Sequence, residues 1–231
     1  MSYQRVDEGM NEIQNTIIPI SVIRRLPKYL TIAKQLRSEG VEWVSSDVLA
    51  EALALTSSTV RQDISHIDFQ GISKKGYSTA GLEVVLTLTL GADRESVCVL
   101  VGAGNLGRAL ATHEEFARQG FRICEVFDNH PSVIGEKIGR FVVRDVSELP
   151  LVVAGQKVEI GMVAVPHDAA QSVADRLIHA GVRGILNLTT AHITVPTGVA
   201  LVDTRIIASL RELAYILKVN ERNDVNEKAD A

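Results

Sequence analysis

Three patterns in the 231-residue sequence predict an α/β fold built in two parts. A glycine-rich turn, Gly102 to Gly107, follows an apolar run and opens a series in which apolar and helical segments alternate. Before it, short helical segments lead to a glycine-bounded hairpin that carries two lysines, and after it comes one amphipathic helix. We therefore expect an N-terminal winged helix-turn-helix, a C-terminal doubly wound parallel sheet of the Rossmann type, and a separate last helix.

Composition and periodicity set the expected boundaries. Residues 1–15 are polar and aperiodic, which is typical of a flexible arm. The winged-helix domain is expected over 16–92 and the Rossmann domain over 93–205. The amphipathic helix takes 206–220, and the charged stretch 221–231 is expected to be disordered.

The N-terminal domain shows helical spacing of apolar residues over 21–40. Pro27 interrupts it, either as a kink or as a first-turn residue of a second helix. Ser45 is suited to cap the next helix, and Thr56–Thr59 to begin a third. Two short helices separated by a few residues fit a helix-turn-helix, and the hairpin Gly71–Tyr77 fits a wing.

The third helix carries Val60 and Ile64 inward and polar side chains outward. With the wing lysines, the predicted DNA-binding residues are Ser57, Ser58, Thr59, Arg61, Gln62, Ser65, Lys74 and Lys75. The excess of basic over acidic residues in this domain is small, and the whole chain has a net charge of −4. A three-helix bundle used for protein contacts is therefore the alternative interpretation.

The glycine-rich turn has the order of a dinucleotide-binding unit. Val97–Val101 is short and β-branched, as a buried parallel strand should be. Gly102 permits the tight turn, Gly104 lets the backbone approach a pyrophosphate, and Gly107 lets helix pack on strand. The helix that follows is expected to continue through Arg118, and its N-terminal N–H groups suit a pyrophosphate.

A second apolar run ends on Asp128, about 20 residues after the last glycine, where an acid accepts the adenosine ribose hydroxyls. No arginine follows to neutralise a 2′-phosphate, so NAD(H) is favoured over NADP(H). The strand ends at Val165-Pro166-His167 and Asn187–Thr190 fall on the same edge of the sheet. The predicted cofactor-binding residues are Gly102, Ala103, Gly104, Asn105, Leu106, Gly107, Asp128, Asn129, Val165, Pro166 and Asn187.

Further strands are expected at 140–143, 158–165 and 184–188, with Ser147 capping a helical stretch between the first two. The last helix carries a wide apolar stripe. It follows the completed sheet, so it needs another surface to cover it, and a partner subunit is the natural candidate. The predicted dimerisation residues are Ile207, Leu210, Leu213 and Leu217.

The sequence offers little for catalysis. His167 and His192 are the only acid–base groups expected on the crevice side, and such histidines more often cap helices or face solvent. Cys98 and Cys124 lie in predicted core strands, so packing is their expected role and no metal site is predicted. The absence of a signal peptide or a membrane-length apolar run predicts a cytoplasmic protein.

Beyond these patterns, the sequence resembles the Rex family of redox-sensing transcriptional repressors over nearly its whole length. The segments that carry the resemblance are Arg24–Leu30, Val60–Ser65, Lys74–Tyr77, Gly102–Gly107, Val165-Pro166 and Gly184–Asn187. The resemblance implies a homodimer with swapped C-terminal helices that binds a palindromic operator DNA. It also implies that NADH releases the DNA. Two alternatives stay open, namely a small NAD-dependent oxidoreductase subunit and a regulator that senses CoA or an adenine nucleotide.

The sequence departs from the family pattern at several points, as a divergent paralogue would. Gln62 stands where Lys or Arg is usual, and Leu188-Thr189-Thr190 replaces Phe-Ala/Thr-Pro after Asn187. The family's tyrosine on the cofactor-domain helix corresponds to His113, and its aspartate before the last helix to Arg205. These changes bear on operator sequence and on coupling between the two domains.

Overall fold

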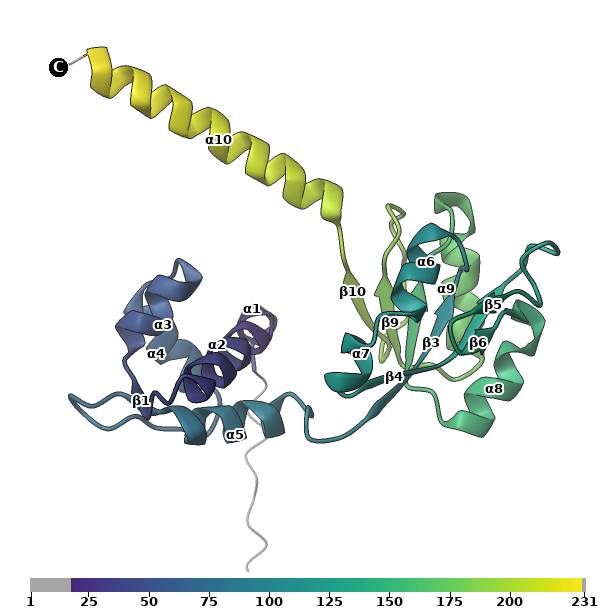
Figure 1. Ribbon diagram of the computed structural model, residues 1–231, viewed down its shortest axis with the longest axis horizontal. Coiled ribbons are helices and arrows are strands. Elements are labelled where there is room, and N and C mark those ends of the chain that lie inside the picture. The colour runs from purple at the N-terminus through teal and green to yellow at the C-terminus, as the bar shows by residue number, and fades with distance from the viewer. Residues whose placement is uncertain (1–17, 230–231) are drawn as a thin grey trace, which may run out of the picture. The chain divides into compact units, whose positions relative to one another are not determined.

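The computed structural model of the chain describes residues 18–229 and divides between Asp93 and Arg94 into two compact units (Figure 1). The division lies one residue from the boundary expected from the sequence. The predicted arm, residues 1–15, falls outside the described residues. Among the helices the structure describes, none is long and apolar enough to cross a membrane.

The N-terminal unit is a winged helix-turn-helix. Its elements are α1 (Ile20–Ile23), α2 (Leu26–Ser38), β1 (Trp43–Val44), α3 (Ser46–Leu53), α4 (Ser57–Ile64), β2 (Tyr77–Ser78) and α5 (Thr79–Thr89). Pro27 lies in the first turn of α2, so the second of the two interpretations of this proline is correct. The expected caps are present, because Ser45 Oγ accepts from Val48 N and Thr56 Oγ1 accepts from Thr59 N.

One apolar core holds this unit together. Helix α2 packs along α5, and α3 packs on α4. The fully buried members of this core include Leu26, Tyr29, Ala33, Leu49, Val60, Ile64, Leu82 and Leu86. The turn between α3 and α4 is tight because Ala54 adopts a left-handed conformation, with φ of 52°.

The wing is held by pairing with the short strand β1, which was not predicted from the sequence. Trp43–Val44 is only two residues long, and it pairs antiparallel with Tyr77–Ser78. Gly76 has φ of 94°, and a β-carbon there would overlap the carbonyl oxygen of Val44. Glycine at the base of the wing is therefore needed both for its backbone conformation and for the close approach to β1.

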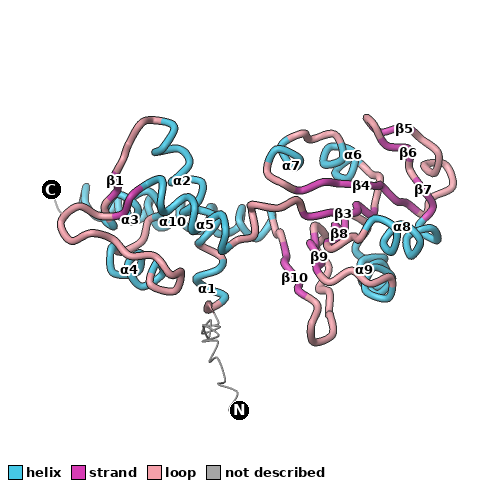
Figure 2. The backbone as a smooth tube through the Cα atoms, turned by 90° about the horizontal axis from the view of Figure 1, so that it is seen from below, coloured by secondary structure: helices cyan, strands magenta, loops and turns pink. Residues whose placement is uncertain are grey.

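The C-terminal unit is built on a six-stranded sheet, and its strands lie side by side in Figure 2. Strands β3 (Ser96–Val101), β4 (Phe121–Asp128), β7 (Arg144–Asp145), β8 (Ile160–Val163), β9 (Gly184–Asn187) and β10 (Ala200–Asp203) are all parallel. The helical segments are α6 (Asn105–Ala111), α7 (Glu115–Arg118), the 3-10 turns η1 (Val146–Glu148) and η2 (His167–Ala169), α8 (Leu149–Gln156), α9 (Ala170–His179) and α10 (Ile206–Ala229).

The strand order is β10-β9-β8-β3-β4-β7. The chain therefore runs outward from β3 on one side and then returns to continue from β3 on the other, which is the Rossmann arrangement. The order reverses between β3 and β8. In such a sheet, ligands bind beyond the carboxyl ends of the strands at this point.

Alternate residues of β3 face two different cores. Val99 and Val101 join the core that α8 and α9 cover, with Leu149, Val152, Ala174 and Leu177. Cys98 and Leu100 join a second core on the opposite face of the sheet. Leu110 of α6 and Phe116 of α7 pack against this core. The sheet is thus covered on both faces, as an all-parallel sheet requires.

Several elements differ from the sequence-based expectation. The single helix expected through Arg118 breaks after Ala111 into α6 and α7. The stretch around Phe141 forms a separate two-stranded hairpin, β5 (Lys137–Ile138) with β6 (Phe141–Val142), and β7 joins the main sheet instead. Asp145 caps the 3-10 turn η1 through a side-chain bond from Ser147 N, and α8 follows η1 with no side-chain cap, so the role predicted for Ser147 was wrong.

The end of the chain differs as well. Strand β10 was not predicted, although it completes the sheet beside β9. Helix α10 runs over Ile206–Ala229, so it continues through a stretch that was expected to be disordered.

Candidate functional site

The glycine-rich turn lies at the reversal point of the sheet, between the ends of β3 and β8. Gly102 has φ of 108°, and a β-carbon there would overlap the carbonyl oxygen of Ala164. A β-carbon on Gly107 would overlap the carbonyl oxygen of Gly102. These two glycines are therefore required by close backbone packing.

Gly104 has a different environment. A β-carbon there would meet nothing within 4 Å, and Gly104, Asn105 and Leu106 are all exposed. The first turn of α6 therefore presents its free N–H groups to open space beside the turn. A phosphate group can approach the backbone here, while Ala103 behind it is buried.

Asp128 is held against this turn at the end of β4. Its Oδ2 accepts from Ala103 N at 2.7 Å, and its Oδ1 accepts from Asn129 N at 2.8 Å and His130 N at 2.9 Å. A carboxylate offers about four acceptor positions, so one remains for a ligand hydroxyl. Asn129 itself is exposed next to it.

The other predicted cofactor residues lie at the ends of β8 and β9. Val165 is half-buried and Pro166 is exposed, directly after β8. Asn187 is 0% exposed, and its Nδ2 donates to Ala191 O and Asp203 Oδ1 while its Oδ1 accepts from Thr189 N and Thr189 Oγ1. Its amide is fully used inside the protein, so it organises the loop after β9.

The sequence did not single out Asp203, because it did not predict β10, the strand that ends at this residue. It ends that strand, accepts from Asn187 Nδ2 at 2.6 Å and lies 3.4 Å from Arg205 Nη2. A carboxylate is therefore present just before the last helix, despite the substitution inferred at Arg205. Beyond it is a cavity of about 620 Å³ between the loop after β9 and the first turns of α10.

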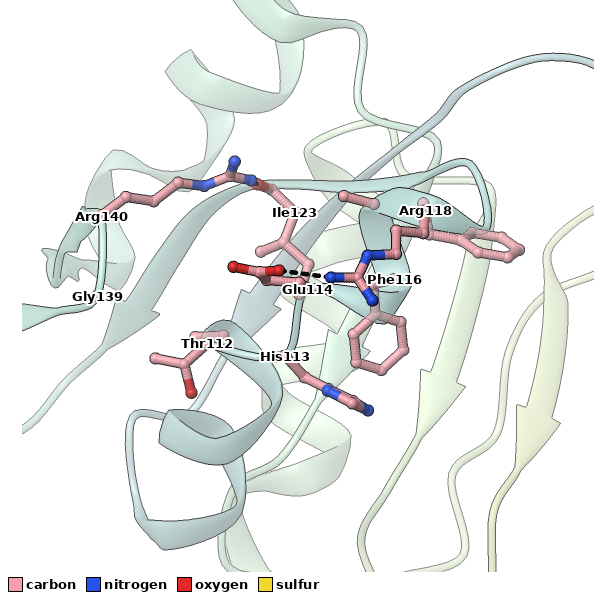
Figure 3. Close-up of a pocket in the computed structure, with 11 residues that line it drawn as sticks. Thr112, His113, Glu114, Phe116, Arg118, Ile123, Gly139 and Arg140 are labelled. Atoms are coloured by element: carbon pink, nitrogen blue, oxygen red, sulfur yellow. Dashed lines mark hydrogen bonds and ion pairs between the residues drawn. The ribbon is translucent and has the colours of Figure 1, made fainter.

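A second cavity, of about 460 Å³, lies at the break between α6 and α7 (Figure 3). His113 lines it and meets the edge of the Phe116 ring, with the two ring centres 5.8 Å apart. Arg118 in its wall is paired with Glu114 at 2.8 Å. None of the predicted cofactor residues lines this cavity.

In the N-terminal unit, the outward face of α4 carries the predicted DNA-binding side chains. Arg61, Gln62, Ser58 and Ser65 are exposed. Arg61 Nη1 donates to Ser46 Oγ at 3.0 Å, which places the guanidinium beside the start of α3. Ser57 and Thr59 are already engaged, because Ser57 donates to Asp47 and Thr59 completes the helix cap.

The wing stands beside α4 across a cleft of about 410 Å³ that Arg61, Lys74 and Lys75 line. Both lysines are exposed, and Lys74 adopts φ of 63°. Lys75 Nζ lies 3.9 Å from the ring centre of Trp43, the only tryptophan of the chain. Three cations thus gather around one cleft, an arrangement suited to a nucleic-acid backbone.

The cysteines and acids form no further site in the described part of the chain. Cys98 is buried, and burial raises the pKa of its thiol to about 12. Burial raises the pKa of Cys124 as well. Neither thiol is suited to act as a nucleophile. Among the side chains that the structure describes, residues 18–220, no group of His, Cys, Asp and Glu is placed to hold a metal ion.

A winged helix-turn-helix joined to a nucleotide-type Rossmann domain defines a class, the ligand-responsive transcription regulators. Two family models agree: "Putative DNA-binding protein N-terminus" matches residues 17–65 and "CoA binding domain" matches residues 93–191. The redox-sensing transcriptional repressor Rex of Clostridium beijerinckii is 37% identical over 204 residues, which cover 88% of this chain and 97% of that protein.

Solved structures lead to the same family. The crystal structure of RSP, a Rex-family repressor, aligns with a TM-score of 0.83 and 34% identity, over 91% of this chain and 99% of that one. RSP in complex with β-NAD⁺ and operator DNA aligns with a TM-score of 0.82 and 34% identity, over 93% and 99%. This chain belongs to the Rex family of redox-sensing transcriptional repressors.

Gly102 and Gly104 should respond to alanine to very different extents. Gly102→Ala forces a positive φ and a clash with a carbonyl, so it should lower the free energy of unfolding by about 2–4 kcal/mol. Gly104→Ala should change it by less than about 0.5 kcal/mol, because its backbone is extended and its surroundings are open. Urea unfolding followed by circular dichroism measures both, and equal effects would contradict the assigned roles.

Proposed function

We propose that this protein is a redox-sensing repressor that binds operator DNA through its winged-helix unit and releases it when NADH binds the Rossmann unit. The observation that carries the proposal is that repressor relatives match both units of the chain together, over nearly their whole length. RSP has been solved with β-NADH and, separately, with β-NAD⁺ and operator DNA.

The chain's own residues fit a dinucleotide. Gly104 and the exposed start of α6 leave room and N–H groups for a pyrophosphate, and Asp128 keeps an acceptor position for the adenosine ribose. Val165 and Pro166 follow the neighbouring strand β8, on the side where the nicotinamide half would extend. The nicotinamide, when bound, supplies the redox state that is sensed. The protein's part is to bind the dinucleotide and to discriminate NADH from NAD⁺.

CoA is a second candidate ligand, because one matching family model bears its name. The adenosine ribose of CoA carries a phosphate. Asp128, placed against the glycine-rich turn, would repel such a group as it would repel the 2′-phosphate of NADP(H). The site therefore favours NAD(H).

We further propose that the protein is not an enzyme. His167 is exposed and lies 3.4 Å from Thr190 Oγ1, a long contact, and His192 is exposed. In the part of the chain that the structure describes, no carboxylate forms a hydrogen bond or an ion pair with either imidazole ring. Neither histidine has the orienting partner that a general acid or base usually needs.

A homodimer is proposed from the apolar side chains of α10. Ile207, Leu210, Leu213 and Leu217 are each 51–55% exposed, and they recur with helical spacing along one stripe. An isolated helix with such a stripe is stable only against another surface. A second copy of the chain, exchanging this helix, would cover it, and the resulting two-fold symmetry would match a palindromic operator. DNA as partner also supports a cytoplasmic location.

The NADH site can be tested at its open glycine. Gly104→Val should abolish NADH binding, because a branched side chain would occupy the pyrophosphate position, while the fold stays intact. Isothermal titration calorimetry measures the affinity, and NADPH titrated into the native protein should bind more weakly than NADH. Undiminished NADH affinity in the variant would refute the site assignment.

The dimer can be tested on the stripe itself. Each buried leucine contributes about 1.5–3 kcal/mol, so Leu210→Asp with Leu213→Asp should yield monomer or aggregate. Glu212→Ala, on the same helix and outside the stripe, is the matched control and should stay dimeric. Light scattering reports the mass, and a well-folded dimer from the double variant would refute the swapped helix.

Coupling between the two ligands is the decisive test of the function. Binding linkage is reciprocal, so operator DNA must weaken NADH binding by the factor by which NADH weakens operator binding. We expect a coupling of about 1–3 kcal/mol, toward the lower end, because His113 replaces the family's tyrosine. Fluorescence titration of NADH with and without operator measures it. Identical NADH affinities in the two titrations would rule out redox sensing even if both ligands bind.

A further inference from the structure

An ionic cluster in the winged-helix unit, with a buried Asp63 and a partly exposed Arg25, joins the start of α2 to α4. Arg25 donates from Nε to Asp63 Oδ2 at 2.5 Å and from Nη2 to Asp63 Oδ1 at 2.6 Å, and the hydroxyl of Tyr29 donates to Oδ2 at 2.8 Å. Asp63 is 1% exposed and Tyr29 is 0% exposed. The cluster therefore ties the DNA-reading helix to a residue 38 positions earlier in the chain.

The partners are held in fixed protonation states. Burial, together with the hydrogen bond to Asp63, raises the pKa of Tyr29, and the hydrogen bond to Asp63 raises the pKa of Arg25. Tyr29 therefore remains a donor and Arg25 a cation over the whole physiological range of pH.

Stability alone is a weak reason for such a cluster. Desolvation of two charges offsets much of their attraction, and apolar residues of similar size often stabilise a core as well or better. The benefit of a bidentate arginine–carboxylate pair is geometric, because two parallel N–H···O bonds fix both the position and the plane of the carboxylate.

The Arg25–Asp63 pair acts on α4, the helix that carries the predicted DNA-binding side chains. Helix α4 has only eight residues, and it buries Val60, Asp63 and Ile64 while Arg61 and Gln62 face outward. Successive residues of a helix are about 100° apart around its axis, so a rotation that moved Asp63 would also swing its outward neighbours. The apolar contacts of Val60 and Ile64 have no directional preference, whereas the two parallel hydrogen bonds between Arg25 and Asp63 do.

We propose that Arg25, Asp63 and Tyr29 are positioning residues that fix the rotation of α4 and thereby set the sequence selectivity of DNA binding. The proposal rests on the proposed function. The three side chains act through Arg61 and Gln62 on the opposite face. Selectivity, defined as the affinity for the preferred duplex divided by the affinity for a scrambled one, is the quantity they control.

The experiment uses the full chain and two DNA duplexes. One duplex is enriched from random-sequence DNA by the native protein, and the other is a scrambled duplex of the same composition. Arg25→Lys keeps the charge but cannot form the bidentate fork. It should lose about tenfold or more in affinity for the enriched duplex, equivalent to about 1.4 kcal/mol. Its affinity for the scrambled duplex should not change, since the charge is conserved. Arg24→Lys, at the exposed neighbouring residue, is the matched control and should leave both affinities unchanged.

A second variant gives a test of sign. Asp63→Asn removes a negative charge from a DNA-binding unit, so electrostatics alone would strengthen binding to both duplexes. Positioning predicts weaker binding to the enriched duplex with equal or stronger binding to the scrambled one. Tyr29→Phe keeps the ring in the core and should reduce selectivity in the same direction by a smaller factor. Circular dichroism confirms that each variant is folded at the assay temperature.

Unchanged selectivity in Arg25→Lys and Asp63→Asn would overturn the proposal. Loss of affinity for both duplexes in proportion to the unfolded fraction would also overturn it, since the cluster would then only stabilise the unit. A native chain that enriches no duplex would refute the proposed function and this proposal with it.

Discussion

The end of β3, the end of β8 and the start of α6 meet at distances that leave no room for side chains at Gly102 and Gly107. This close approach places the first turn of α6 at the point where the strand order reverses. It leaves Gly104, the one glycine of the turn with open surroundings, facing outward. Asp128 then reaches across from β4 to hold Ala103. The predicted binding geometry of the unit follows from this backbone contact, because the predicted cofactor residues outside the turn lie at the ends of strands of the same sheet.

The winged-helix unit must hold the short helix α4, which carries the predicted DNA-binding side chains. Its reading helix is short, and short helices are marginal without tertiary support. Support comes from one apolar core, while the ionic cluster on Asp63 fixes the geometry of the helix and β1 and Gly76 hold the wing. The outward side chains can therefore be polar and exposed, as DNA contact requires, without loss of the helix that carries them.

Cofactor and DNA are bound by different units, so a repressor of this kind needs an element that responds to both. The residues just before α10 are suited to this role, because Asp203 links the buried loop organiser Asn187 to Arg205 at the start of the helix. The cavity at this point borders both the loop after β9 and α10. A ligand beyond the end of β9 would thus lie near the helix that is proposed to join two subunits.

The sequence by itself determined the parts whose requirements are local. Glycine spacing predicted the tight turn, since close backbone packing excludes side chains at Gly102 and Gly107, and helical periodicity with caps such as Ser45 predicted the winged helix. It also predicted the acid at Asp128 from its distance to the turn. The break after Ala111 left no such trace, because a three-residue interruption hardly alters the apolar spacing of a helix.

Only the tertiary structure decided the features whose partners are remote in the chain. Strand β10 is four residues long and mostly exposed, so its pairing with β9, not its composition, makes it a strand. The sequence predicted a cofactor role for Asn187 but not the hydrogen bonds of its amide to Thr189, Ala191 and Asp203. The pairing of Arg25 with Asp63 likewise depends on the fold of the unit, which brings the residue before α2 to α4. A hydrogen bond or a strand pair joins two residues that can be far apart in the chain. The local sequence around either residue does not identify its partner.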